Sequence, residues 1–278
     1  MKIEEKQQRL DTILAEYGSI AIAFSGGVDS SFLAAAAKKM LPGKVLLLNA
    51  QSPAFPEDEA AFVRWFADEQ DLPLRIVNTK ELDIKEYAEN APTRCYFCRH
   101  ELFAKLRPIA EAADIAVLAD GANADDRNDF RPGLRAAAEW EVKHPLQDAG
   151  LEKADIRELS RLMNLPTWNK PAYACLASRF PYGEKINPKK LQRVAAAERV
   201  LQRRGFRIYR VRSHGNLARL EFGDDEIERG FLMREELSCE LKELGYAYIT
   251  IDLQGYRMGS MNEVLFKNTG RDADSHTA

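Results

Sequence analysis

Long apolar runs are missing from this sequence of 278 residues. A helix needs about 18 or more consecutive apolar residues to cross a bilayer, and no stretch of the chain approaches that length. The N-terminal segment MKIEEKQQRL carries charges where a secretory signal would have its apolar core. We therefore expect a soluble, cytoplasmic protein without a membrane partner.

A surplus of positive charge is also absent. The chain has 40 Lys and Arg against 43 Asp and Glu, which gives a formal net charge of −3. Proteins that bind nucleic acid through a broad face are typically basic. The charge balance therefore disfavours a nucleic-acid partner, while a local basic patch remains compatible with it.

Cysteine is scarce, with four residues in the chain: Cys95, Cys98, Cys175 and Cys239. In a reducing compartment we do not expect them to form structural disulfides. A close pair such as Cys95 and Cys98 is better explained by metal binding or catalysis. Cys239 lies in the amphipathic segment REELSCELKELG, where we expect a small buried side chain.

The first half of the chain alternates apolar runs with helical patterns. The runs are rich in Val, Ile and Leu, which is typical of strands covered on both faces. They span 19–24, 44–50, 72–78 and 115–120, and the helical segments between them span 30–40, 56–70 and 96–113. This alternation predicts right-handed βαβ units, that is, an α/β fold with a doubly wound parallel sheet.

The pattern changes near residue 165, where proline becomes frequent. We predict a first domain over 1–165, a linker and site loop over 166–187, and a smaller C-terminal α+β domain over 188–268. That second domain should contain a helix over 188–204, a hairpin over 206–222, two short helices and a strand over 246–253. The polar tail, 269–278, is expected to be disordered.

The stretch FSGGVDSS, residues 24–31, follows the first predicted strand and enters a helix. Gly26 and Gly27 allow backbone N–H groups to approach an anion, Ser25 and Ser30 add hydroxyl donors, and the helix start adds its dipole. A Gly-rich turn with a polar cap is the simpler alternative. The stretch lacks the lysine of a Walker A motif. It resembles the PP-loop, S-G-G-x-D-S, of the ATP pyrophosphatases, which implies that it binds ATP and that Asp29 acts through Mg²⁺.

A second polar stretch, LADGANADDRNDFRPG, follows the fourth predicted strand. Ligands of open α/β sheets bind at the carboxyl ends of the strands, so this loop is expected at the same edge as the PP-loop. PP-loop enzymes have a similar G-x-N-x-D-D pattern near the nucleotide. We therefore include Asp125 among the predicted nucleotide-binding residues, with a solvated acidic turn as the alternative.

The segment TRCYFCRHELF contains a C-x-x-C pair that can hold one metal ion or one cluster. Three interpretations remain open. The pair is an ordinary reduced one, or it forms half of a zinc site with His100, or it joins Cys175 to hold an iron–sulfur cluster with one iron left open for chemistry.

Two further segments, DIRELSRLMNLPTWNKPAYACLASRFPYG and DLQGYRMGSMNE, resemble the LarE family, the ATP-dependent sulfur transferases of nickel-pincer cofactor synthesis. The resemblance runs from the PP-loop to about residue 263. It implies that a carboxylate of pyridinium-3,5-dicarboxylate mononucleotide is adenylated, that pyrophosphate leaves, and that sulfur replaces an oxygen. Some members sacrifice the sulfur of a single cysteine at the position of Cys175. Because this sequence has Cys95 and Cys98 in addition to Cys175, the resemblance indicates the type that uses a [4Fe–4S] cluster.

The resemblance also assigns roles to single residues. It makes Cys175 and Asp29 catalytic, and it places Arg210 and Arg212 at the phosphate of the mononucleotide. Both arginines lie two apart on a predicted strand, hence on one face, and a solvated strand face is the alternative. Arg257 is matched as a further binding residue. The resemblance implies a sulfide donor and a homo-oligomer, and it leaves open the roles of Arg179, Glu198, Asp225, His144 and His214.

Other functions share parts of this pattern. A PP-loop tRNA thiolase can use three cysteines and a cluster, but the acidic balance and the CLASRFPYG block disfavour it. A non-enzymatic nucleotide sensor with a redox-responsive cysteine pair would bind ATP and release no pyrophosphate. An ammonia-using synthetase shares the loop and leaves the three cysteines unexplained.

Overall fold

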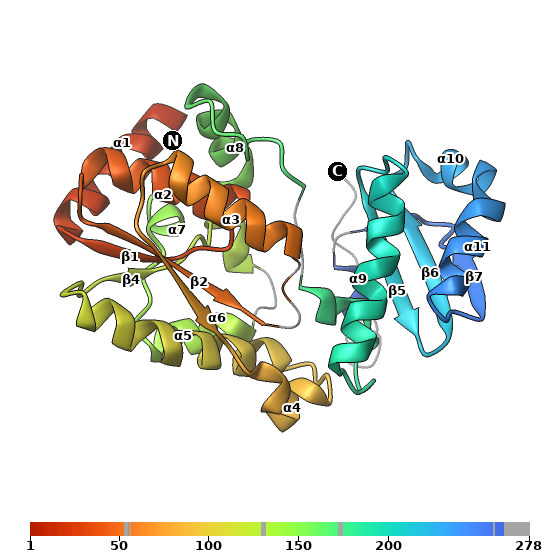
Figure 1. Cartoon of the computed structure of the whole chain (residues 1–278). Coiled ribbons are helices and arrows are strands. Elements are labelled where there is room, and N and C mark those ends of the chain that lie inside the picture. The colour runs from red at the N-terminus through yellow and green to blue at the C-terminus, as the bar shows by residue number, and fades with distance from the viewer. Residues whose placement is uncertain (53–54, 56, 129–131, 172–174, 258, 264–278) are drawn as a thin grey trace. The chain divides into compact units, whose positions relative to one another are not determined.

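The computed structural model describes residues 1–52, 55, 57–128, 132–171, 175–257 and 259–263 (Figure 1). The chain divides into two compact units, Met1–Tyr173 and Ala174–Ala278. This division falls inside the segment 166–187 that the sequence marks as a linker and site loop. The predicted tail, 269–278, lies outside the described residues.

The first unit contains a parallel sheet of four strands in the order β3-β2-β1-β4. The strands are β1 Ile20–Ala23, β2 Val45–Gln51, β3 Leu74–Asn78 and β4 Leu118–Ala119. In register, β1 pairs with β2 through Ile20 and Val45, and with β4 through Ala21 and Leu118. The predicted α/β class with a parallel sheet is therefore confirmed.

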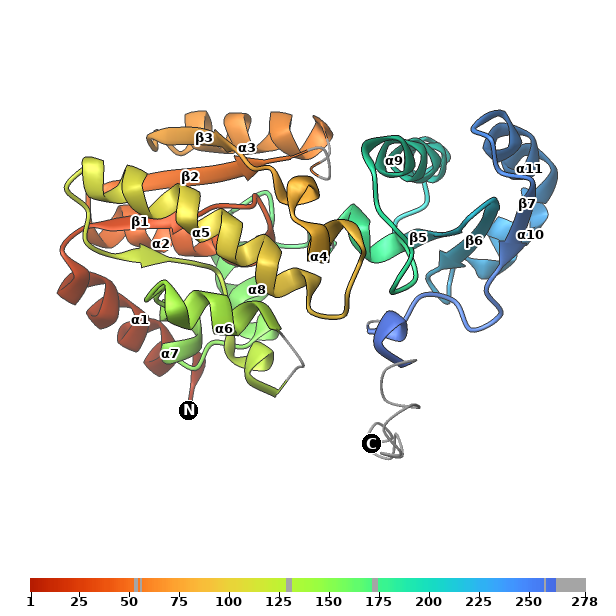
Figure 2. The same ribbon diagram turned by 90° about the horizontal axis from the view of Figure 1, so that it is seen from below.

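Helices cover both faces of this sheet. Their bounds are α1 Ile3–Tyr17, α2 Val28–Met40, α3 Glu57–Glu69, α4 Lys85–Ala88, α5 Arg94–Ala112, α6 Pro132–Glu139, α7 Pro145–Asp148 and α8 Lys153–Leu162. Short 3₁₀ turns span Glu81–Asp83 and Ala124–Asn128. Figure 1 shows α2 and α3 on one side of the sheet and α5 on the other, and in Figure 2 α5 crosses in front of the strands.

Alternate strand residues supply the two halves of the core, as the pleat requires. Ile20, Ile22 and Leu47 pack in a cluster with residues of α1, α2, α3 and α8. Ala21, Leu46 and Leu48 pack with residues of α5 and α6. Strands β1, β2 and β4 are therefore buried on both faces, which explains their near-continuous apolar runs. The expectation that the run 72–78 is covered on both faces is wrong, because β3 is an edge strand with Arg75, Ile76 and Asn78 exposed.

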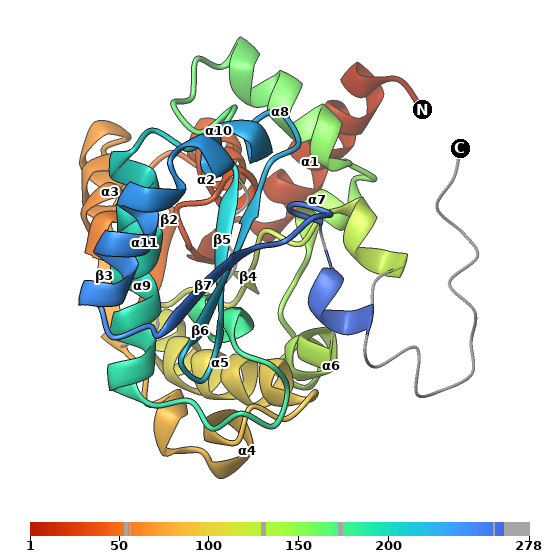
Figure 3. The ribbon, with the colours of Figure 1, turned by 90° about the vertical axis from the view of Figure 1, so that its right-hand side faces the viewer.

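The second unit is a small α+β structure (Figure 3). Its strands are β5 Tyr209–His214, β6 Leu217–Phe222 and β7 Tyr248–Ile251, with β5 antiparallel and β7 parallel to β6. Its helices are α9 Pro188–Arg203, α10 Ile227–Leu232 and α11 Arg234–Glu243, and 3₁₀ turns span Leu176–Arg179 and Ser260–Asn262. α9 contacts β5, and α11 contacts both α9 and β7.

The prediction that Cys239 is buried is wrong, because its side chain on α11 is exposed. The buried residues of this helix are Leu237 and Leu241, four positions apart, and they define the face that packs inward. Cys239 lies two residues from each of them, which places it on the opposite face of a 3.6-residue turn.

Among the described residues, no helix combines enough length with enough apolar character to cross a membrane.

Candidate functional site

The phosphate loop connects β1 to α2 through two glycines. Gly26 has φ +75°, a left-handed conformation that side chains rarely adopt. A Cβ atom added there would lie 3.0 Å from Val63 Cγ2 and 3.2 Å from Phe62 Cδ1. Both the backbone and the packing of α3 against the loop therefore require glycine at this position.

The polar groups of the loop converge on one turn. The Ser25 and Ser30 hydroxyl oxygens lie 3.1 Å apart, and the Gly27 N–H donates to Ser25 Oγ over 3.4 Å. Gly27 is the residue that precedes α2, whose first N–H groups have no partner within the helix. The structure thus brings Ser25, Gly26, Gly27 and Ser30 together in an arrangement suited to a phosphate.

Asp29 lies in the first turn of α2 and has cationic and amide partners. The Lys153 ammonium donates to Asp29 Oδ2 over 2.6 Å, and the amide of Asn123 lies 3.5 Å from Oδ1. We expected this carboxylate to act through Mg²⁺, and in the structure its charge is matched by Lys153. Within the described residues, the structure does not bring three or more His, Cys, Asp or Glu side chains together as a metal-binding group.

The second predicted stretch meets the phosphate loop. Asp125 Oδ2 accepts a hydrogen bond from the backbone N–H of Lys153 at the start of α8, over 2.9 Å. Its own N–H donates to Asn123 Oδ1 over 3.0 Å. Asp125 therefore fixes the residue whose ammonium reaches Asp29, so the acidic loop and the PP-loop form one site.

Two lysines of this site were missed by the sequence interpretation. Besides Lys153, Lys170 donates from Nζ to the Gly26 carbonyl over 3.1 Å and to Glu59 Oε2 over 2.6 Å. Its ammonium also lies 3.8 Å from the centre of the Phe62 ring. The one available signal was the missing Walker lysine, because a polyphosphate still needs cationic partners from elsewhere in the chain.

The cysteine pair lies in the first turn of α5. Cys95 is exposed and Cys98 is partly buried. Because residues three and four apart share a helix face, Cys95, Cys98 and Arg99 lie on one side of α5. Arg99 donates to Asp120 Oδ2 over 2.8 Å, and Asp120 follows β4 at the carboxyl edge of the sheet. The start of α5 is thereby tied to the edge at which the phosphate loop opens.

His100, the possible partner of the pair in a zinc site, packs among aromatic rings. Its ring centre lies 5.4 Å from that of Trp140 and 5.9 Å from that of Tyr96.

Cys175, the third predicted cysteine, belongs to the second unit. It is exposed and comes directly before the 3₁₀ turn Leu176–Arg179, where its carbonyl accepts the Ser178 N–H over 2.9 Å. Arg179 in the same turn is fully buried and grips Glu198 with two hydrogen bonds of 2.7 and 3.0 Å. The cysteine therefore stands on a turn held by a buried ion pair.

Arg210 and Arg212 are both buried, with 8% of each residue exposed, so the alternative of a solvated strand face is wrong. Arg212 holds Glu221 bidentately, over 2.9 and 2.8 Å, and donates to the Ser178 carbonyl over 2.9 Å. The Arg210 guanidinium lies 4.8 Å from the centre of the Tyr256 ring.

Charged side chains gather around Arg210. The Glu198 carboxylate is held bidentately by Arg179, and the Glu221 carboxylate is held bidentately by Arg212. Burial lowers the pKa of Arg210, and the charges of Arg179 and Arg212 lower it further, while Glu198 raises it. Arg179, Arg210 and Arg212 thus form an arginine cluster, and guanidinium groups are well suited to bind a phosphate group.

The remaining candidates of the second unit have partners of their own. Arg257 donates to Glu263 Oε1 over 3.0 Å at the surface. Asp225 pairs with Arg207 over 2.7 Å, also at the surface. Burial lowers the pKa of His214, as does the charge of Arg219.

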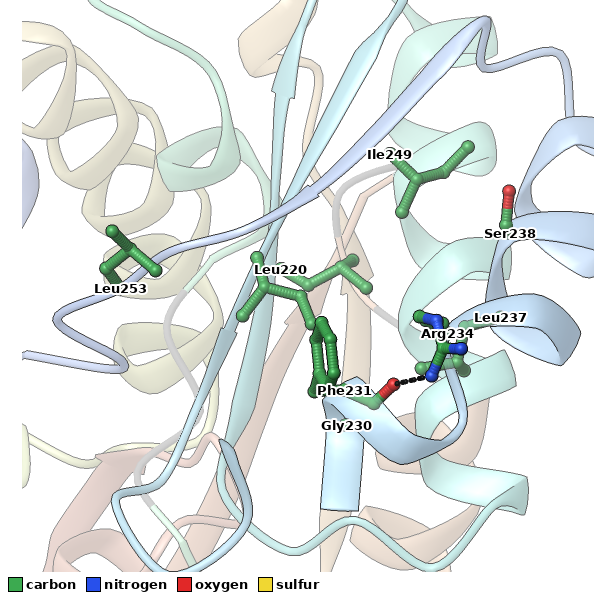
Figure 4. A pocket seen from close by; sticks show the side chains of 9 residues that line it. Leu220, Gly230, Phe231, Arg234, Leu237, Ser238, Ile249 and Leu253 are labelled. Atoms are coloured by element: carbon green, nitrogen blue, oxygen red, sulfur yellow. Dashed lines mark hydrogen bonds between the residues drawn. The ribbon is translucent and has the colours of Figure 1, made fainter. Parts of the chain in front are cut away.

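A hollow of about 340 Å³ opens elsewhere in the second unit (Figure 4). It is lined mainly by apolar side chains of α10, α11, β6 and β7, and the carbonyl of Phe231 accepts a hydrogen bond from Arg234 over 3.4 Å. None of the predicted site residues lines it. The polar chemistry is therefore expected at the phosphate loop and the arginine cluster.

Comparisons with known proteins identify the family of this chain. The family model described as asparagine synthase matches residues 14–168. Pyridinium-3,5-bisthiocarboxylic acid mononucleotide synthase of Lactiplantibacillus plantarum is 32% identical over 94% of this chain and 95% of its own length. Uncharacterized proteins of Synechocystis sp. and Methanocaldococcus jannaschii are 40% and 30% identical, over 95% and 86% of this chain and 100% and 90% of their own lengths. The chain belongs to the PP-loop superfamily and, within it, to the LarE family, and it is an ATP-using sulfur transferase.

Proposed function

We propose that this protein replaces carboxylate oxygen by sulfur in pyridinium-3,5-dicarboxylate mononucleotide, for synthesis of the nickel-pincer cofactor. The name of the L. plantarum relative supports the substrate, because a dicarboxylate is the oxygen counterpart of a bisthiocarboxylic acid. The observation that carries the proposal is geometric: Arg99 and Asp120 tie the cysteine-bearing start of α5 to the sheet edge that holds the phosphate loop. Nucleotide chemistry and thiol chemistry thus share one edge of the first unit.

The first step activates the carboxylate. One carboxylate oxygen attacks the α-phosphorus of ATP, the bond to the bridging oxygen breaks, and pyrophosphate leaves. The phosphates would be bound by the loop N–H groups, by the Ser25 and Ser30 hydroxyls, and by the ammonium groups of Lys153 and Lys170, which contact the loop and Asp29. Mg²⁺ bound at Asp29 would neutralise charge on the leaving pyrophosphate.

The second step transfers sulfur. Sulfide attacks the activated carboxyl carbon, AMP leaves, and a thiocarboxylate forms; a second round at the other carboxylate gives the dithiocarboxylate. Cys95, Cys98 and Cys175 would hold a [4Fe–4S] cluster, and three thiol ligands suit a cluster with one iron left without a protein ligand. When bound, the cluster supplies a deprotonated sulfide ready for attack. The proposal also includes a separate sulfide donor, a homo-oligomeric assembly and a cytoplasmic location. Membership of the LarE family supports these three points.

The products of ATP test this function directly. We expect ATP to be split into AMP and pyrophosphate only when the dicarboxylate mononucleotide is present, since a carboxylate oxygen must attack the α-phosphorus. Chromatography of the nucleotides, with mass analysis of the pyridinium product for oxygen-to-sulfur exchange, measures both steps. Release of ADP and orthophosphate, or AMP formation with the substrate left out, would contradict it.

The arginine cluster is expected to bind the phosphate of the mononucleotide. Replacing Arg210 by Met should weaken binding of the mononucleotide by roughly ten- to a hundredfold, because one charge-assisted hydrogen-bonded pair contributes about 1.5–3 kcal/mol, while the Kd of ATP stays unchanged. Calorimetric titration of each ligand measures this. The control is Arg193→Met, which removes another arginine that stacks on a tyrosine ring in the same unit, 4.4 Å from the centre of Tyr246. An equal loss for both ligands would place the phosphate elsewhere.

A further inference from the structure

Asp120 is a buried carboxylate with three partners. Its Oδ1 lies 2.7 Å from His144 Nδ1 and accepts the Ala122 N–H over 3.0 Å, and its Oδ2 accepts from Arg99 over 2.8 Å. Burial raises the pKa of this carboxyl, but the hydrogen bond to His144 and the charge of Arg99 lower it more, so the net direction is downward. An ionised carboxylate can only accept hydrogen bonds, so Nδ1 of His144 carries a proton. Asp120 is therefore fixed in place from three sides.

The residue after Asp120 touches the phosphate loop. A Cβ atom added to Gly121 would lie 2.9 Å from the backbone nitrogen of Ser30 and 3.3 Å from the carbonyl carbon of Asp29. No side chain fits between these two backbones, and the neighbours are backbone atoms that cannot rotate away. The Gly121 backbone therefore packs directly against the first turn of α2.

The partner Arg99 is fixed as well. It stands one residue after Cys98 on α5, and a Cβ atom added to Gly133 of α6 would lie 2.6 Å from Arg99 Cδ. The α6 backbone therefore packs directly against the stem of Arg99 and keeps its guanidinium directed at Asp120. The phosphate loop is thus connected to the cysteine pair by three successive neighbours. Gly121 packs against the first turn of α2, Asp120 precedes it, and Arg99 on α5 donates to Asp120.

We propose that Asp120 is a positioning residue that couples nucleotide binding at the phosphate loop to the order of the cysteine-bearing start of α5. This role rests on the proposed function for its purpose, because the cysteines matter to the reaction only if they deliver sulfur. An anion bound in the loop restricts the motion of the first turn of α2. Because Gly121 packs against that turn, the position of Asp120 is restricted as well, and Arg99, which is hydrogen-bonded to Asp120, then restricts the start of α5. The thiols then take a defined position when nucleotide is bound.

Hydrogen exchange measured by mass spectrometry tests the coupling without any sulfur transfer. The probe is a non-hydrolysable ATP analogue with a methylene bridge between the α and β phosphorus atoms. In the wild type it should slow exchange at residues 25–31 and also, by about fivefold or more, at residues 94–103. In Arg99→Met and in Gly133→Ala, which displaces Arg99 without removing its charge, the slowing at 25–31 should remain and that at 94–103 should disappear.

Arg107→Met is the matched control, because Arg107 is on the same helix and donates to the carbonyls of Ala116 and Trp140 instead of Asp120. It should keep both effects of the analogue even if it lowers the melting temperature. The coupling is overturned if α5 shows no slowing in the wild type, or if Arg99→Met and Gly133→Ala keep it.

Product formation separates this proposal from the function on which it rests. A wild type that shows the coupling and makes no thiocarboxylate would refute the function and retain the coupling. Sulfur transfer by the wild type, with the same ratio of sulfur transferred to AMP formed in Arg99→Met, would refute the coupling alone.

Discussion

Replacing Cys175 by alanine is expected to abolish sulfur transfer, while AMP and pyrophosphate still form in a single turnover. Cys95→Ala and Cys98→Ala should have the same effect, because all three thiols are proposed to hold one cluster. Anaerobic purification with iron and sulfide analysis should show that each variant loses the cluster together with the activity. Rapid-quench measurement of pyrophosphate follows the first step separately.

Cys239→Ala is the control for these variants, since Cys239 is an exposed thiol on α11 that enters neither the site nor the core. It should retain cluster and activity. The competing mechanism, in which Cys175 gives up its own sulfur, makes a different prediction. The protein would lose the mass of one H₂S after a single round, and Cys95→Ala and Cys98→Ala would stay fully active. That combination would exclude the cluster.

Asp29→Ala is expected to lower formation of AMP and pyrophosphate by roughly 10²–10³-fold, the range seen when one preorganised electrostatic group is removed. The change removes a charge beside the phosphates and leaves the Lys153 ammonium without its carboxylate partner. Asp29→Asn separates the two effects, because it keeps the size of the side chain. If the carboxylate holds Mg²⁺, this variant should need more Mg²⁺ for half-maximal rate, whereas Lys153→Met should raise the KM for ATP alone.

Glu158→Gln provides the control for Asp29, because Glu158 also pairs with a cation, Arg161 at 2.7 Å, and both side chains are about half exposed on the surface of α8. It should keep its turnover. Equal rates for Asp29→Asn and Lys153→Met at every Mg²⁺ concentration would show that Asp29 serves only to hold the lysine.

The strands and the phosphate loop could be predicted because their signals are local. Apolar runs buried on both faces and an S-G-G-x-D-S turn after a strand depend on few neighbours. The lysines could not be predicted in this way, since only the folded chain shows that Lys153 and Lys170 reach the loop. The burial of Arg210 and Arg212 could not be predicted for a different reason. The alternation of the strand places them on one face, but charged side chains are mostly exposed. The partners that stabilise Arg212 in the interior, Glu221 on β6 and the Ser178 carbonyl, come from other elements.

Cys239 illustrates the limit of an amphipathic pattern. The segment REELSCELKELG shows that one face of the helix is apolar, and the phase of that face is set by Leu237 and Leu241. A small residue of intermediate polarity between them gives no independent signal. Cys239 is exposed because it lies on the side of the helix opposite Leu237 and Leu241. The residue type cysteine does not by itself indicate that side.

The distance along the chain between the loop and its lysines has a consequence for folding. Asp29 and Lys153 are 124 positions apart, and Gly26 and Lys170 are 144 apart. During synthesis the β1-loop-α2 segment leaves the ribosome long before either lysine, and contacts of such long range form late because loop closure must come first. A chain released before residue 153 would lack both lysines, although it contains all four strands of the first sheet. Nucleotide affinity would then appear only at the end of folding, so refolding followed by binding of a fluorescent ATP analogue should lag behind the recovery of secondary structure.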